Sequence, residues 1–253
     1  MSETSKRRGV AIKVRGLWKS YNHNAVLRGI DMDVEPGETL VIIGGSGEGK
    51  SVLIRQIIGL ERPDRGEIRL DGTTAEDYVA MAIDQKPFRI SMVFQNSALL
   101  NSLTVGDNVS LALREHRMAD AASIRRIVRE CLEQVEMEGT EGKMPSELSG
   151  GMRKRVAIAR ALAVDSDVIL YDEPTAELDP ILTEEVGQLI RRIQERRGPT
   201  QVVVTHNLPL ARAIADHVAV LREGQVVDFR TGEDFWRSDH PHTRNFLRAA
   251  KVV

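Results

Sequence analysis

A glycine-rich run that ends in a lysine and a serine points to phosphate chemistry. Glycines let backbone N–H groups approach a polyanion, the Lys50 ammonium reaches the β- and γ-phosphates, and the Ser51 hydroxyl is placed to ligate Mg²⁺. An ordinary Gly-rich turn is the alternative. An apolar run at residues 39–43 precedes the motif and an amphipathic run at residues 52–58 follows it, which is the strand and helix context that the motif requires. The sequence therefore predicts a nucleoside triphosphate site at Gly44, Gly45, Ser46, Gly47, Glu48, Gly49, Lys50, Ser51 and Val52.

Two carboxylates follow a second apolar run, at residues 168–171. Ligands of open α/β sheets bind at the carboxyl ends of the strands. We expect Asp172 to hold Mg²⁺ and Glu173 to polarise the water that attacks the γ-phosphate. An isolated acidic pair after a strand is more often a helix cap or a solvated loop. The phosphate-binding loop in the same chain favours the catalytic interpretation.

A second candidate phosphate cradle begins at Ser149. Gly150 and Gly151 follow it and open an amphipathic segment, so a serine and two bare backbone amides lie at a predicted helix N-terminus. Taken alone, this would be an ordinary serine N-cap after a glycine turn. With two cradles in one chain, the economical hypothesis is that each serves a nucleotide held mainly by another copy.

The hydrophobic pattern divides the chain into strand-rich and helical parts. Alternation in the first forty residues predicts an antiparallel piece, and strand, helix and strand in succession predict a parallel sheet. The spacing also predicts a helical stretch of unassigned role at residues 74–86. The other expected elements are strands at 67–70, 89–94, 168–171, 201–204, 218–221 and 225–229, a mostly helical insert at 105–164, a helix at 182–197 and a short helical segment near the end.

Composition bounds the class of protein. The chain has 253 residues, 42% of them hydrophobic and 28% charged, with a net charge of −2. Scattered Lys and Arg residues argue against a nucleic-acid partner. The one cysteine, Cys131, fits a buried small hydrophobe in a reducing compartment. No apolar run approaches about 18 residues, and residues 1–8 lack the apolar region of a signal peptide, so we expect a chain that neither spans a membrane nor is secreted.

Together these motifs resemble the ATPase subunits of ABC transporters, over residues 10–237. The resemblance implies an α/β fold of the P-loop NTPase class, with a RecA-like parallel core, an antiparallel β subdomain, a helical subdomain at about 96–164 and a short tail at 238–253. Further motif residues carry it: Tyr21, Gln95, Leu148-Ser149-Gly150-Gly151, Leu178-Asp179 and His206.

The resemblance also implies a mechanism. Two copies would sandwich two ATP molecules, each between the P-loop of one copy and the Ser149 cradle of the other. Tyr21 would stack on adenine, and Asp179 would line the opposite subunit's site. Gln95 would contact Mg²⁺ or water, Glu173 would act as base, and His206 would contact the γ-phosphate.

A finer resemblance concerns ATPases that serve phospholipid transporters of the MCE/Mla type. It is carried by residues 94–100, 107–109, 113–116 and 145–155. It implies an MCE-type lipid-binding protein as an indirect partner. The broader resemblance to ABC ATPases implies an integral membrane permease that docks near residues 96–105, and a place on the cytoplasmic face of the inner membrane. The alternatives are an importer for small solutes such as amino acids or ions, and a soluble single-cassette scaffold ATPase.

Several positions depart from the family pattern. Glu48 places a carboxylate inside the phosphate-binding loop, where it could lower nucleotide affinity unless it points to solvent. Ala176 and Glu177 replace the small residues common before Leu178, which could alter contacts across the dimer. The tail is short, so the sequence gives no support for a regulatory contact by it.

Overall fold

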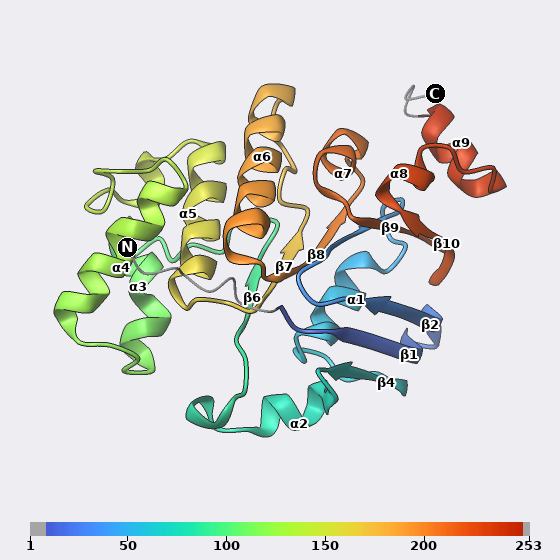
Figure 1. Cartoon of the computed structure of the whole chain (residues 1–253), viewed down its shortest axis with the longest axis horizontal. Coiled ribbons are helices and arrows are strands. Elements are labelled where there is room, and N and C mark those ends of the chain that lie inside the picture. The colour runs from blue at the N-terminus through green and yellow to red at the C-terminus, as the bar shows by residue number, and fades with distance from the viewer. Residues whose placement is uncertain (1–8, 250–253) are drawn as a thin grey trace.

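The computed structural model describes residues 9–249, which form two sheets and a set of helices (Figure 1). The strands are β1 (Ile12–Tyr21), β2 (Asn24–Val34), β3 (Thr39–Ile43), β4 (Arg65–Leu70), β5 (Thr73–Thr74), β6 (Ile90–Val93), β7 (Val168–Asp172), β8 (Thr200–Thr205), β9 (His217–Arg222) and β10 (Gln225–Thr231). The helices are α1 (Lys50–Ile57), α2 (Ala75–Ala80), α3 (Val105–Glu115), α4 (Ala121–Gln134), α5 (Gly150–Ala163), α6 (Pro180–Arg197), α7 (Leu208–Ile214), α8 (Gly232–Phe235) and α9 (Pro241–Ala249), with short 3₁₀ turns η1 (Ile83–Gln85) and η2 (Pro145–Glu147).

The central sheet has six strands in the order β10-β9-β3-β8-β7-β6. All neighbours pair in parallel except β10, which runs antiparallel to β9. Every residue of β3, β7 and β8 is buried, as expected for parallel strands covered on both faces. Alternate residues of β3 enter different cores: Val41 and Ile43 face one core, and Leu40 and Ile42 face the other.

The second sheet is antiparallel and has the order β2-β1-β4-β5. Its buried residues, among them Ile12 and Val14 of β1 and Ile30 of β2, join α1 in the core on one face of the central sheet. On the opposite face, helices α3 to α7 form the other core (Figure 1). This arrangement confirms the predicted parallel core, antiparallel β subdomain and helical subdomain.

Cys131 lies on α4 and is only 2% exposed. Burial raises the pKa of its thiol to about 11, so the group is protonated at neutral pH. It therefore packs as a small hydrophobe, in agreement with the sequence pattern. None of the helices within residues 9–249 combines the length and apolar character needed to cross a membrane.

The predicted helical stretch at residues 74–86 is wrong in extent. The helix α2 ends at Ala80, because Met81 takes an extended backbone conformation with φ −69° and ψ 143°. Tyr78 holds the following turn in place: its ring stacks on Phe88 at 4.8 Å, and its hydroxyl donates to the Phe88 carbonyl at 3.0 Å. These are tertiary contacts, and the helical spacing of apolar residues in the sequence contains no information about them.

The described part of the predicted tail, residues 238–249, contacts the rest of the fold. The Asp228 carboxylate on β10 accepts hydrogen bonds from the hydroxyls of Ser238 at 2.7 Å and Thr243 at 2.6 Å. Leu247 of α9 is 1% exposed and joins the core. Residues 238–249 therefore pack against the domain, whereas 1–8 and 250–253 lie outside the described residues.

Candidate active site

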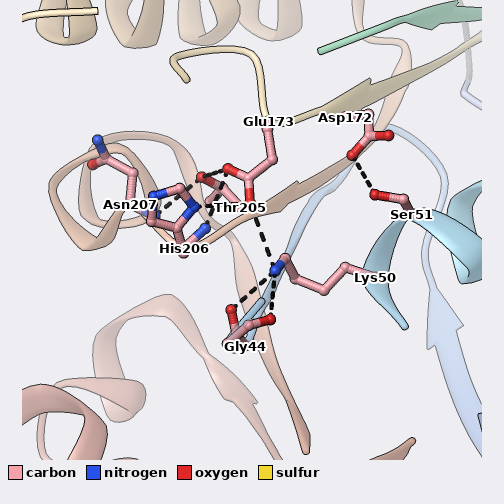
Figure 2. A network of polar contacts seen from close by, with 9 residues as sticks. Gly44, Lys50, Ser51, Asp172, Glu173, Thr205, His206 and Asn207 are labelled. Atoms are coloured by element: carbon pink, nitrogen blue, oxygen red, sulfur yellow. Dashed lines mark hydrogen bonds and ion pairs between the residues drawn. The ribbon is translucent and has the colours of Figure 1, made fainter. Parts of the chain in front are cut away.

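The predicted site residues gather at the carboxyl ends of three adjacent strands. In the order β3-β8-β7, the strands are parallel neighbours, so the segments that follow them meet at one edge of the sheet. The phosphate-binding loop leaves β3. Asp172 ends β7 and Glu173 follows it, and Thr205 ends β8 and His206 follows it. Figure 2 shows these side chains directed toward one another.

The loop from Gly44 to Gly49 turns tightly into α1. Gly49 has φ 99°, and a Cβ there would lie 2.8 Å from a methyl group of Leu27 and 3.0 Å from the carbonyl oxygen of Val26. Only glycine fits this approach. The Lys50 ammonium donates to the carbonyl oxygens of Gly44 at 3.0 Å and Gly45 at 2.9 Å, so the loop wraps around the lysine.

Ser51 and Asp172 form an oxygen pair beside the lysine. The Ser51 hydroxyl donates to Asp172 Oδ1 at 2.9 Å. Burial raises the pKa of the Asp172 carboxyl above its ordinary value, although the Ser51 hydrogen bond opposes this shift. A buried carboxylate next to a hydroxyl fits Mg²⁺, which proteins hold through one or two carboxylates plus substrate phosphates. The described residues contain no cluster of three or more His, Cys, Asp and Glu side chains that would suggest a different kind of metal site.

Glu173 is held from three directions. Its Oε2 accepts from the Thr205 hydroxyl at 2.9 Å and from the backbone N–H of His206 at 3.4 Å. Its Oε1 lies 2.9 Å from His206 Nδ1 and 3.6 Å from the Lys50 ammonium (Figure 2). The residue has φ 46°, a left-handed conformation that is uncommon outside glycine and typical of functional sites.

Thr205 is a site residue that the sequence interpretation missed. It is fully buried as the last residue of β8, and besides donating to Glu173 it accepts from the backbone N–H of Asn207 at 3.1 Å. Its position immediately before His206, at the end of a buried strand, is the signal that could have identified it.

The family model described as ABC transporter matches residues 27–176, more than half of the chain. The chain belongs to the ABC transporter ATP-binding family. It is 40% identical over 244 residues to a probable ribonucleotide transport ATP-binding protein, mkl, of Mycobacterium leprae, covering 96% of this chain and 70% of the relative. It is 37% identical over 247 residues to a probable amino-acid ABC transporter ATP-binding protein of Haemophilus influenzae, covering 95% and 96%.

Solved ABC cassettes have the same fold. An ATP-binding cassette determined as a dimer in a post-hydrolysis state, bound to ADP and Pi, superposes with a TM-score of 0.78 at 32% identity, over 87% of this chain and 98% of that one. The cassette cbiO1 of Clostridium perfringens, part of the ABC transporter complex cbiONQ, gives a TM-score of 0.82 at 30% identity, over 96% and 97%. This chain is therefore an ABC-type ATPase.

Other residues that the sequence predicts to contact nucleotide lie outside this cluster. Ser149 caps α5, accepting from the Met152 N–H at 3.3 Å, and it is exposed together with Gly150. Asp179 caps α6 in the same way, accepting from the Leu182 N–H at 2.9 Å. In a single copy these groups face outward, as a surface that receives a second copy would require.

Gln95 and Tyr21 lie at the margins of the site. The Gln95 side chain is exposed, and the contact that fixes this residue is its backbone carbonyl, which accepts from Lys154. Tyr21 ends β1 with 40% of its surface exposed, and its hydroxyl donates to the Glu61 carboxylate. A ring fixed at its hydroxyl and partly exposed suits stacking.

The Glu48 side chain is partly exposed and reaches toward a neighbouring turn. Its carboxylate accepts from the backbone N–H of Glu223, in the turn between β9 and β10. The departure noted in the sequence thus gives the cassette a link between the phosphate-binding loop and a neighbouring hairpin.

Proposed function

We propose that this cassette is the ATP-hydrolysing subunit of a membrane transporter, working as a pair of copies that close on ATP and open after hydrolysis. Each site would join Lys50 and Glu173 of one copy to the Ser149-Gly150-Gly151 cradle of the other. The observation that carries the proposal is the arrangement around Glu173, where a carboxylate is aimed by Thr205 and His206 beside the phosphate-binding lysine.

The division of labour follows from these contacts. Glu173 would accept the proton of the attacking water, because it is fixed in direction by its partners. Ser51 and Asp172 would hold Mg²⁺, which neutralises charge on the phosphates. His206, with 66% of its side chain exposed, would contact the γ-phosphate and respond to its loss. Tyr21 would stack on adenine, and Gln95 would contact Mg²⁺ or water. Asp179 would line the site of the opposite subunit.

Glu173→Gln tests the proposal. The amide keeps the shape but cannot accept the proton, so we expect phosphate release to fall by at least about a hundredfold while ATP binding persists and a dimer accumulates. Phosphate release and sedimentation in MgATP measure both effects. Full residual hydrolysis would show that Glu173 is not the general base. A protein that stays monomeric when saturated with MgATP would show that two copies do not sandwich the nucleotide.

The transported substrate is best supported as a small solute. Relatives in the comparison are named for amino-acid transport and for import of methionine and of sulfate or thiosulfate. We therefore place solute import ahead of the lipid reading. Phospholipid transport of the MCE type is the second candidate, since it rests on the sequence around residues 94–100, 107–109, 113–116 and 145–155.

The permease would dock near residues 96–105, at the cytoplasmic face of the inner membrane. A groove beside α3, which residues 96–105 do not line, is a second candidate for this contact. It has a volume of about 490 Å³, and residues that include Ile83, Lys86, Arg89 and His116 line it. His116, the last residue of the segment 113–116 that carries the lipid resemblance, thus lines this groove.

Purification with the membrane subunit distinguishes the substrates. Bound phospholipid found by mass spectrometry, together with an MCE-type protein, would favour the lipid transporter. Stimulation of hydrolysis by a soluble solute, with no lipid bound, would favour import. A soluble assembly that contains no integral membrane protein would favour a scaffold ATPase.

A further inference from the structure

Two cations on α5 hold the segment that carries Gln95. The Lys154 ammonium donates to the carbonyl oxygen of Gln95. The Arg160 guanidinium donates to the carbonyl oxygens of Ser97 at 2.9 Å and Ala98 at 2.6 Å. Three carbonyl oxygens in residues 95–98, called here the Gln95 segment, therefore accept hydrogen bonds from side chains of one helix.

The Gln95 segment has a fixed and unusual shape. Ser97 and Ala98 have φ 63° and 45°, left-handed values that cost free energy for residues with a Cβ. Ser97 is 3% exposed, and its N–H donates to the Phe94 carbonyl at 2.9 Å. These conformations direct successive carbonyls toward α5, and the two cations bind them there.

Both cations are partly removed from water, which distinguishes their hydrogen bonds from contacts between fully exposed side chains. Lys154 is 6% exposed, and burial lowers the pKa values of both Lys154 and Arg160. Lys154 donates to a neutral carbonyl oxygen, and the negative charges of Glu177, Glu173 and Asp172 also favour its charged form. Loss of either cation leaves carbonyl oxygens of the Gln95 segment, partly buried at Gln95 and Ser97, without their charged donor.

The same helix begins at the second phosphate cradle. Ser149 caps α5, and Gly150 and Gly151 form its first turn, so Lys154 lies little more than one turn from the cradle. A continuous helix moves as a unit, because its backbone hydrogen bonds resist local stretching.

We propose that Lys154 and Arg160 are positioning residues that couple the Gln95 segment to the Ser149-Gly150-Gly151 cradle. When nucleotide contacts reposition Gln95, the two cations carry the displacement into α5 and align the cradle for the second copy. The inference rests on the proposed ATP sandwich and adds a mechanical link within each copy.

The test uses the full chain in the Glu173→Gln background, where hydrolysis does not empty the site. Lys154→Met removes the donor while preserving length and apolar character. We expect dimerisation in MgATP to require about tenfold more protein, the scale of one lost charge-assisted contact, while the affinity of the dilute monomer for nucleotide changes by less than about twofold. Lys154→Arg should restore dimerisation.

Arg153→Met is the matched control, because Arg153 is an exposed cation on the same helix. It should dimerise as the parent does. Arg160→Lys is the second variant, since it keeps the charge but loses the paired donors, and it should weaken dimerisation by about threefold. Normal dimerisation of Lys154→Met, or equal weakening by Arg153→Met, would overturn the coupling. Should Lys154→Met fail to fold, Arg160→Lys decides between the same outcomes.

Hydrogen exchange separates failure of the coupling from failure of the sandwich. If the Glu173→Gln parent stays monomeric in MgATP, the sandwich is wrong, but the link can still be measured in the monomer. MgATP should then change amide exchange at residues 150–153 in the parent and not in Lys154→Met. The same change in both proteins, or no change in the parent, would overturn the coupling.

Discussion

At the residue scale, Glu48 ties the phosphate-binding loop to its surroundings through a turn. Its carboxylate accepts from the Glu223 N–H, and the next carbonyl, that of Gly224, accepts from the N–H of Arg28 on β2 at 2.8 Å. These two hydrogen bonds link the phosphate-binding loop to the β9–β10 turn and that turn to the antiparallel sheet. The carboxylate also leaves one negative charge near the place where polyphosphate binds.

Glu48→Gln separates the contact from the charge. The amide oxygen still accepts from Glu223, but the repulsion of phosphate is removed, so we expect KM for MgATP to fall by about two- to fivefold at low salt. Glu48→Ala loses the acceptor as well and should raise KM. Steady-state phosphate release at two ionic strengths measures both, with Glu223→Gln, an exposed charge in the same turn, as control. An unchanged KM in Glu48→Gln would show that the Glu48 charge does not affect the binding of MgATP.

Asp172 shows a conflict between stability and function. Its pKa is raised in the fold by burial, so ionisation of this carboxyl opposes folding as pH rises past its ordinary value, and the penalty persists at neutral pH. Asp172→Asn should therefore raise the Tm of the nucleotide-free protein at pH 7, by about 2–4 °C for each kcal/mol gained. It should also abolish Mg²⁺-dependent hydrolysis. The gain should shrink below about pH 4, where the wild-type carboxyl is protonated in both states. A lower Tm for Asp172→Asn at pH 7 would contradict this account.

At the element scale, Asp228 is the residue that holds the C-terminal helices. Burial tends to raise the pKa of this carboxyl, but hydrogen bonds from Thr243, Ser238 and Arg230 outweigh burial and lower it. A lowered pKa means that this carboxylate stabilises the fold above its ordinary pKa, and that the contribution is lost as pH falls through the folded-state value. Ionised Asp228 therefore contributes to the docking of α9, together with the buried Leu247.

Asp228→Ala should release α9 without disturbing the central sheet. We expect faster proteolysis after residue 238 and a loss of about 1–3 kcal/mol in the free energy of unfolding, since buried hydroxyls lose a charged acceptor. Limited trypsin digestion and a thermal melt measure the two effects. Asp239→Ala is the control, because that carboxylate lies in the same region but is 89% exposed. Equal protection of α9 in both variants would show that its apolar contacts suffice.

Sequence patterns predict elements well where one chain segment contains the whole signal. The apolar run of β3, the following glycines and Lys50 are contiguous, and so are β7 and its two carboxylates. Thr205, Lys154 and Arg160 escaped notice because their partners lie far away along the chain, 59 residues in the case of Lys154 and Gln95. The end of α2 and the docking of α9 depend on nearer contacts, Tyr78 with Phe88 10 residues away and Thr243 with Asp228 15 residues away, but these are also tertiary contacts that a hydrophobic period does not contain.

At the scale of the whole molecule, the groups expected to face a second copy lie on one surface. A Cβ added to Gly150 would lie 3.8 Å from Leu178, and one added to Gly151 would lie 3.4 Å from Leu182. The start of α5, with its phosphate cradle, is therefore adjacent to Asp179 and the start of α6. Ile181 projects from this surface with 72% of its area exposed, more than any other large hydrophobic residue in residues 9–249.

Ile181→Glu should weaken pairing of the cassette without affecting the single copy. An exposed isoleucine beside Asp179 gains from burial against a partner, whereas a glutamate there would carry its charge into the interface and lose hydration. In the Glu173→Gln background we expect at least about tenfold more protein to be needed for the MgATP dimer, with nucleotide affinity of the monomer and Tm unchanged. Leu60→Glu is the matched control, because Leu60 is 59% exposed but follows α1, away from α5 and α6. Sedimentation of both variants in MgATP measures their dimerisation. If Ile181→Glu and Leu60→Glu dimerise equally well, the second copy does not pack against the start of α6. The two copies would then have to pair through another face.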